Sequence, residues 1–131
     1  MSNKRIKIAV VGVGNCASSL MQGLTYYKDA DLDTPIVGLM HTILGGYKVS
    51  DIKIVEAFDV NKTKVGKDLA DAIFAHPNNT KKFSSVPKTG VIVHNSQVLD
   101  GIGEFVKAII PISNVSIPDP VKILKESGAE I

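Results

Sequence analysis

Residues 12 to 17 of the sequence read Gly-Val-Gly-Asn-Cys-Ala, which is a G-x-G-x-x-A pattern. In this pattern the first glycine permits a sharp turn, the second leaves room for a ligand to approach the backbone, and the alanine lets a helix pack closely on a strand. The first N–H groups of a helix that begins at such a loop bind anions, and the helix dipole assists them. The pattern therefore predicts a pyrophosphate-binding loop formed by Gly12, Val13, Gly14, Asn15, Cys16 and Ala17.

Asp59 is the second candidate site residue, because it stands near the end of an apolar segment, Ile52 to Val60, that follows this loop in the chain. An acidic residue at the end of the second strand of a dinucleotide-binding unit accepts hydrogen bonds from the adenosine ribose and disfavours a 2′-phosphate. Asp59 lies 45 positions after Gly14, where about 20 is usual, and an insertion between the two accounts for the excess. Asp59 therefore predicts NAD rather than NADP as the ligand. The alternative is a turn or cap residue ahead of Asn61.

The other chemically versatile residues indicate neither a metal site nor a catalytic group in this chain. A helix N-terminus can activate a cysteine thiol, but the need for a small side chain beside a pyrophosphate explains Cys16 more simply. The three histidines have no cysteine or histidine at metal-ligand spacing and no nucleophile motif beside them. They are His41, His76 and His94. We therefore predict no metal ligand and no catalytic residue in this sequence.

The elements that must position the candidate residues alternate between strands and helices. Apart from Lys7, the segment Ile6 to Val11 is entirely β-branched or alanine, which predicts a parallel strand buried on both faces. A helix is expected from Cys16 to about Tyr27, where apolar residues recur at helical spacing. The residues of its inner stripe are Ala17, Leu20, Met21 and Leu24. Residues 28 to 51, which contain a proline and several glycines, are interpreted as an insertion.

The second half of the chain continues the alternation. After the predicted strand Ile52 to Val60, apolar residues four positions apart predict the buried face of a second helix. They are Val65, Leu69 and Ile73. A polar loop over residues 76 to 90 leads to a third strand, Val91 to Val93. This order predicts an α/β fold, with a Rossmann-like parallel sheet and flanking helices.

A last helix and the beginning of another strand are predicted near the C-terminus. Asp119 can cap a helix that has Pro120 at its first position and Gly128 as its terminator. Val121 and Leu124 are expected on its inner face. Residues 129 to 131 resemble the opening of a further strand, so we expect the sheet to be incomplete and the natural chain to continue. The alternative is a frayed tail of a complete small domain.

The composition predicts one folded domain over residues 1 to 131 and excludes several kinds of partner. Hydrophobic residues make up 44% and charged residues 21% of the chain, as in ordinary globular proteins. The 15 basic and 13 acidic residues are spread along the chain, without the basic block that nucleic acid or anionic lipid favours. The first apolar run is far shorter than the roughly 20 residues that cross a bilayer. A single cysteine fits the reducing cytoplasm.

The sequence resembles the bacterial and archaeal branch of the myo-inositol-1-phosphate synthase family, also called inositol-3-phosphate synthase. The matching segments run along nearly the whole chain, and GLMH and KVGKDL after the glycine loop are the most specific. The segments are VGVGNCASSL (Val11 to Leu20), GLMH (Gly38 to His41), AFDV (Ala57 to Val60), KVGKDLADAIFA (Lys64 to Ala75), NNT (Asn78 to Thr80) and LDGIG (Leu99 to Gly103).

This resemblance implies an isomerase that converts glucose 6-phosphate to myo-inositol phosphate. In the family, bound NAD⁺ oxidises C5 of the sugar, C6 then attacks the C1 aldehyde, and the hydride returns, so that no net oxidation occurs. The resemblance assigns residues 12 and 14 to 17 to the pyrophosphate loop and Asp59 to the adenosine ribose. It places Asn78, Asn79 and Thr80 in a loop near the cofactor. The family's catalytic lysines lie in a separate domain, which also forms a tetramer.

We therefore expect this chain to be the N-terminal NAD-binding part of such an enzyme, without its catalytic and tetramerisation domain and inactive by itself. Two alternatives remain open at this point. One is a fragment of an NAD-dependent sugar or inositol dehydrogenase, whose nucleotide domain opens with the same fingerprint. The other is a non-catalytic module that binds a dinucleotide.

Overall fold

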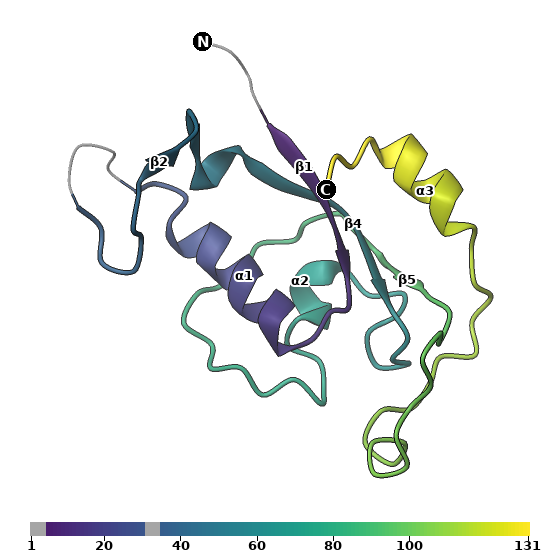
Figure 1. The fold of residues 1–131 in the computed structure, drawn as a ribbon. Coiled ribbons are helices and arrows are strands. Elements are labelled where there is room, and N and C mark those ends of the chain that lie inside the picture. The colour runs from purple at the N-terminus through teal and green to yellow at the C-terminus, as the bar shows by residue number, and fades with distance from the viewer. Residues whose placement is uncertain (1–4, 31–34) are drawn as a thin grey trace.

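A computed structural model describes residues 5–30 and 35–131 of the chain. Its centre is a parallel sheet in the order β1-β4-β5, formed by β1 (Ile6–Val11), β4 (Ile52–Asp59) and β5 (Val93–Asn95). The helices α1 (Asn15–Tyr26) and α2 (Leu69–Ala72) lie on one side of this sheet, and α3 (Pro120–Ser127) lies on the other (Figure 1). The predicted α/β fold with a Rossmann-like parallel sheet is confirmed.

The last two residues of the chain run along the edge of β1 that does not face β4. The Glu130 N–H donates to Lys7 O and the Ala9 N–H donates to Ile131 O, each over 2.8 Å. Since Glu130 pairs with Lys7 and Ile131 pairs with Ala9, the two segments run in the same direction. These hydrogen bonds place the end of the chain along the free edge of β1, but residues 129 to 131 form no regular strand in the structure.

A register shift divides β4 into two parts. Ile8 lies opposite Ile54 and Ala9 lies opposite Glu56, so Val55 is one residue in excess on β4. Ile54 before the shift and Ala57 after it both belong to the hydrophobic core. Side chains alternate between the two faces along a regular strand, so residues 54 and 57 would lie on opposite faces. The extra residue places both of them on the face of the core.

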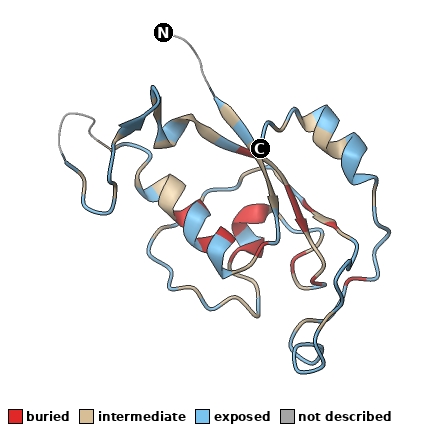
Figure 2. Cartoon of the chain, in the orientation of Figure 1, coloured by how far each residue is buried: buried red, intermediate tan, exposed pale blue. Residues whose placement is uncertain are grey.

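The core lies between the sheet and the pair α1 and α2, where Figure 2 shows most of the buried residues. The fully buried side chains of Leu69, Ile73 and Val93 meet there. On α1, the prediction that Leu20 faces the core is wrong, because this residue is 44% exposed. Gln22 is fully buried instead, since its side-chain oxygen accepts the N–H groups of residues 83 and 84 and so holds that loop against the helix.

Three further expectations differ from the structure. β1 is not buried on both faces, and Val11 at its end is 77% exposed. The third strand begins and ends two residues later than predicted. In α3 the Asp119 cap and the left-handed Gly128 are confirmed, but Val121 is exposed. None of the residues of α3 is buried.

The interpreted insertion contains structure that its sequence did not predict. A short antiparallel hairpin is formed by β2 (Ile43–Leu44) and β3 (Tyr47–Lys48), and a 3₁₀ turn (Val49–Asp51) leads directly into β4.

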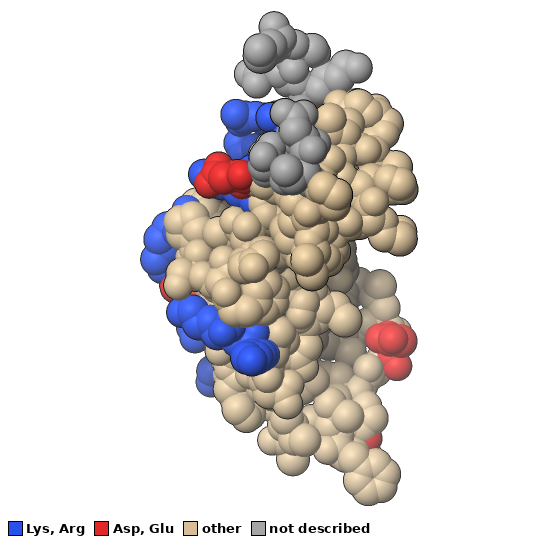
Figure 3. All heavy atoms as spheres, turned by 90° about the vertical axis from the view of Figure 1, so that its left-hand side faces the viewer, with Lys and Arg blue, Asp and Glu red and all other residues tan. Residues whose placement is uncertain are grey.

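In the view of Figure 3, the lysine and arginine side chains gather along one margin of this side of the molecule. Within the described residues, none of the helices has both the length and the apolar character needed to cross a membrane.

Asp68 fastens the short helix α2 to the chain segment that precedes β5. Its carboxylate caps the helix at the Ala70 N–H and accepts the N–H groups of Thr89 and Gly90 as well as the Thr89 hydroxyl. Burial raises the pKa of this carboxyl group, but the hydrogen bonds together outweigh burial and hold the pKa of Asp68 below its usual value.

Candidate functional site

A cleft of about 570 Å³ opens at the carboxyl ends of the three parallel strands. Its walls are formed by the glycine loop at the end of β1, residues 58 to 61 at the end of β4, the side chain of Lys64, and the segment that follows β5. Ligands of open parallel sheets bind at this end of the strands. The cleft is therefore the candidate functional site.

Positions 12 and 14 of the loop are glycines for different structural reasons. Gly12 has a φ of +94°, a conformation that disfavours any side chain, and its N–H donates to Phe58 O at the end of β4. Gly14 has a φ of −89°, which any residue can adopt, and a Cβ built on it meets no atom within 4 Å. Gly14 lines the cleft. The fold therefore requires glycine at position 12, while at position 14 its absent side chain keeps the cleft open.

The amino end of α1 offers free N–H groups at this edge of the cleft. Gly14 is the N-cap residue, no side chain caps the helix, and the Ser18 N–H makes the first helical hydrogen bond, to Gly14 O. The N–H groups ahead of Ser18 therefore have no partner within the helix. Such an end carries a partial positive charge and attracts anions.

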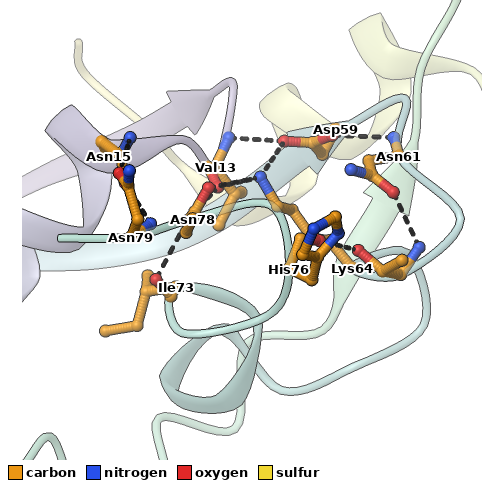
Figure 4. A network of polar contacts seen from close by, with 10 residues as sticks. Val13, Asn15, Asp59, Asn61, Lys64, Ile73, His76, Asn78 and Asn79 are labelled. Carbon is orange, nitrogen blue, oxygen red and sulfur yellow. Dashed lines mark hydrogen bonds and ion pairs between the residues drawn. The ribbon is translucent and has the colours of Figure 1, made fainter. Parts of the chain in front are cut away.

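Asp59 lies at the carboxyl end of β4, where the sequence predicts it, and it holds two backbone groups. Its Oδ2 atom accepts the Val13 N–H over 2.7 Å and its Oδ1 atom accepts the Asn61 N–H over 2.7 Å (Figure 4). The side chain is 10% exposed and lines the cleft. A carboxylate oxygen can accept a second hydrogen bond, so Asp59 can serve the loop and a ligand together.

Lys64 is a site residue that sequence reasoning missed. It is 4% exposed, and its Nζ atom donates to Val13 O over 2.7 Å and to Asn78 Oδ1 over 2.8 Å. The same Nζ atom lies 3.9 Å from Asp59 Oδ2. Burial lowers the pKa of Lys64, and the charge of Asp59 opposes this effect. Its own segment gives no signal, because residues 60 to 68 are mostly polar and lysines in turns are usually solvated.

The predicted loop residues Asn78, Asn79 and Thr80 lie at the site but contact the protein in two different ways. Asn78 Nδ2 donates to Val13 O over 3.0 Å and to Ile73 O over 2.9 Å. Asn79 and Thr80 instead bind Asn15, whose Oδ1 atom accepts both of their N–H groups and the Thr80 hydroxyl. The Asn15 side chain therefore latches residues 79 and 80 to the start of α1.

Of the residues that the sequence predicts for the site, Gly12, Gly14 and Asp59 line the cleft. Hydrogen bonds tie Asn78 to Val13 of the glycine loop, and Asn79 and Thr80 to Asn15 at the start of α1. Cys16 is exposed at the start of α1, and Ala17 is buried beneath it. Asn61 adds a polar group, because it is 2% exposed, lines the cleft and leaves its Nδ2 atom without a hydrogen-bond partner. Among residues 5–30 and 35–131, no three side chains of the metal-ligating types gather in one place.

Comparison with known proteins identifies relatives of the whole chain. A protein of Mycolicibacterium smegmatis named inositol-3-phosphate synthase is 51% identical over 96% of the chain. Proteins of the same name from Mycobacterium tuberculosis and Corynebacterium glutamicum are 48% and 46% identical over 99% and 100% of the chain. The chain spans 35% or 36% of the length of these three relatives. No family model matches the chain.

Two solved structures resemble the chain over 96% of its length. The crystal structure of Ari2 superposes with a TM-score of 0.71 at 31% sequence identity, and the chain covers 36% of it. A myo-inositol-1-phosphate synthase-related protein from Thermotoga maritima superposes with a TM-score of 0.59 at 22% identity, over 33% of its length. The second likeness supports the fold alone.

Proposed function

Since this chain belongs with the inositol-3-phosphate synthases in sequence and corresponds to about a third of their length, we propose that it binds NAD for such an enzyme. The observation that carries the proposal is the cleft at the strand ends, where free helix N–H groups and the Asp59 carboxylate lie on neighbouring walls. A dinucleotide presents a negative pyrophosphate and a ribose diol, and these two chemistries match the two walls.

Three features of the structure fit this cofactor. Gly14 leaves an open space where a side chain would otherwise stand, beside the free N–H groups. Asp59 is held at the end of β4 with acceptor capacity to spare. The buried Asn61 Nδ2 atom lacks a partner beside the cleft, and an unpaired buried donor is costly unless a ligand or water satisfies it.

In the proposed complex each group has one task. The N–H groups at the start of α1 bind the pyrophosphate, and the helix dipole adds to this attraction. Asp59 accepts the ribose hydroxyls and disfavours a 2′-phosphate through charge repulsion. When bound, the cofactor would supply reversible hydride transfer to and from the sugar. The residues of this chain orient the cofactor, and we assign none of them to the sugar.

Calorimetric titration of the 131-residue chain with NAD⁺ and NADP⁺ tests the cofactor proposal. We expect NAD⁺ to bind more tightly than NADP⁺. Asp59→Asn should weaken NAD⁺ by about 1 to 3 kcal/mol, the scale of a hydrogen bond to a charged acceptor, and should affect NADP⁺ less. Glu126→Gln removes the same charge from the exposed face of α3 and serves as the matched control. A folded Asp59→Asn variant with unchanged NAD⁺ affinity would remove Asp59 from the site.

For the whole enzyme we propose the conversion of glucose 6-phosphate to inositol phosphate, with assembly into a homo-oligomer. We expect the 131-residue chain alone to show no turnover, because no lysine cluster that could stabilise an enolate stands among its described residues beside the cleft. Inositol phosphate formation is measured with NAD⁺ and glucose 6-phosphate, beside the Mycolicibacterium smegmatis relative as control. Turnover by the chain alone would mean that it holds the catalytic groups.

A further inference from the structure

Both peptide groups that flank Val13 are held by side chains, and a charged group holds each of them. The Val13 N–H donates to Asp59 Oδ2, and Val13 O accepts from Lys64 Nζ over 2.7 Å and from Asn78 Nδ2 over 3.0 Å. Val13 itself is fully buried between the two loop glycines. The turn that carries the glycine pattern is therefore clamped from both sides of one residue, as Figure 4 shows.

A buried lysine is a costly way to hold a carbonyl oxygen. Removing an ammonium group from water carries a large desolvation cost, and burial lowers the pKa of Lys64 accordingly. Asp59, 3.9 Å away, offsets part of this cost. An apolar side chain of similar length would fill the same space without that cost. The charge therefore points to a task beyond packing.

The peptide geometry indicates what this task is. In a trans peptide the carbonyl oxygen of one residue and the N–H of the next point in opposite directions. When Lys64 and Asn78 fix the direction of Val13 O, they also fix the Gly14 N–H, which must point away from them. Gly14 lines the cleft, and its N–H group stands at the start of the uncapped helix end.

We propose that Lys64 is a positioning residue, which orients the Val13–Gly14 peptide so that the Gly14 N–H faces the pyrophosphate of the dinucleotide. This inference rests on the proposed function. Lys64 acts through the peptide group and not through contact with the ligand. Asn78 shares the task, because it donates to the same oxygen from the opposite loop.

Two ligands separate positioning from a general structural role. ADP-ribose contains the pyrophosphate, while adenosine contains only the base and ribose that lie toward Asp59. Lys64→Met should weaken ADP-ribose by about 10-fold to 100-fold, the scale of a lost hydrogen bond to a charged group, and should leave adenosine binding unchanged. Lys67→Met is the matched control, because Lys67 is an exposed lysine of the same segment. Affinities are measured by NMR titration of the 131-residue chain.

The outcomes are distinct. If the wild-type chain binds neither ligand, the proposed function fails and this inference falls with it. If the wild type binds ADP-ribose and Lys64→Met weakens both ligands equally, or neither, the inference alone is overturned. Should Lys64→Met not fold, Asn78→Ala replaces it, because that variant keeps the Lys64 bond to Val13 O. We then expect a smaller loss confined to ADP-ribose, and equal loss of both ligands overturns the inference.

Discussion

The charged pair Asp59 and Lys64 should show strong energetic coupling in the folding of the chain. Coulomb's law at an effective dielectric constant of about 20 gives roughly 4 kcal/mol for unit charges at their separation of 3.9 Å. Partial exposure of Asp59 reduces this value, and we expect a coupling free energy of about 2 kcal/mol. Asp59→Ala removes two hydrogen bonds and leaves the buried ammonium without its counter-charge, at a cost of about 3 to 5 kcal/mol.

The sign of the second substitution provides the sharper test. In the wild type, Lys64→Met removes hydrogen bonds to Val13 O and Asn78 and should lower the free energy of unfolding. In the Asp59→Ala background, the same substitution removes an uncompensated buried charge and should leave stability unchanged or raise it. Urea denaturation of the wild type, both single variants and the double variant measures this cycle. Additive effects, within about 0.5 kcal/mol, would refute the coupling.

Three further predictions follow from the geometry. Gly12→Ala should lower the free energy of unfolding by about 1 to 2 kcal/mol, because Gly12 has a φ of +94°. Gly14→Ala should melt like the wild type and lose NAD⁺ binding. Equal melting temperatures of the two variants would contradict this prediction. Asp68→Ala should destabilise the chain by a constant amount above about pH 5 and by less below about pH 4, because a carboxyl group with a lowered folded-state pKa loses its contribution as it is protonated. Urea denaturation across this range checks it, and a difference unaffected by acid would count against it. Asn15→Ala should speed amide hydrogen exchange at Asn79, whose N–H it otherwise binds over 2.9 Å, while α2 exchanges as before.

The parts of the fold that could be predicted from sequence are those decided by local pattern. β1 has the predicted bounds because an apolar run ends at a glycine that must turn. Asp59 reaches the cleft because parallel strands place their carboxyl ends at one edge of the sheet. The exposure of Leu20 and the burial of Gln22 could not be predicted in this way. They depend on a loop some 60 residues away, which binds the polar side chain of Gln22.

The same distinction applies to the site. The glycine pattern identifies the loop, and the position of Asp59 follows from the strand order. The role of Lys64 depends on partners 51 and 14 residues away in the chain, and a lysine in a turn otherwise predicts a solvated side chain. For Asn15 the sequence predicts a backbone N–H at the pyrophosphate, and the structure adds that its side chain binds Asn79 and Thr80. For that residue, only the backbone N–H remains available to a ligand.

The extra residue in β4 determines which of the following side chains face the core. With uninterrupted alternation, Ile54 would share its face with Glu56 and Phe58, and Asp59 would emerge on the opposite side from the core. The excess residue Val55 reverses this parity, so that Glu56 meets His94 on the far face while Asp59 meets Val13. Deletion of Val55 would therefore remove the register shift without moving Asp59, because Ile54 and Glu56 would become consecutive residues of a regular strand and keep their present faces. Loss of a single residue between Glu56 and Asp59 would instead move the carboxylate to the face opposite the core, away from Val13.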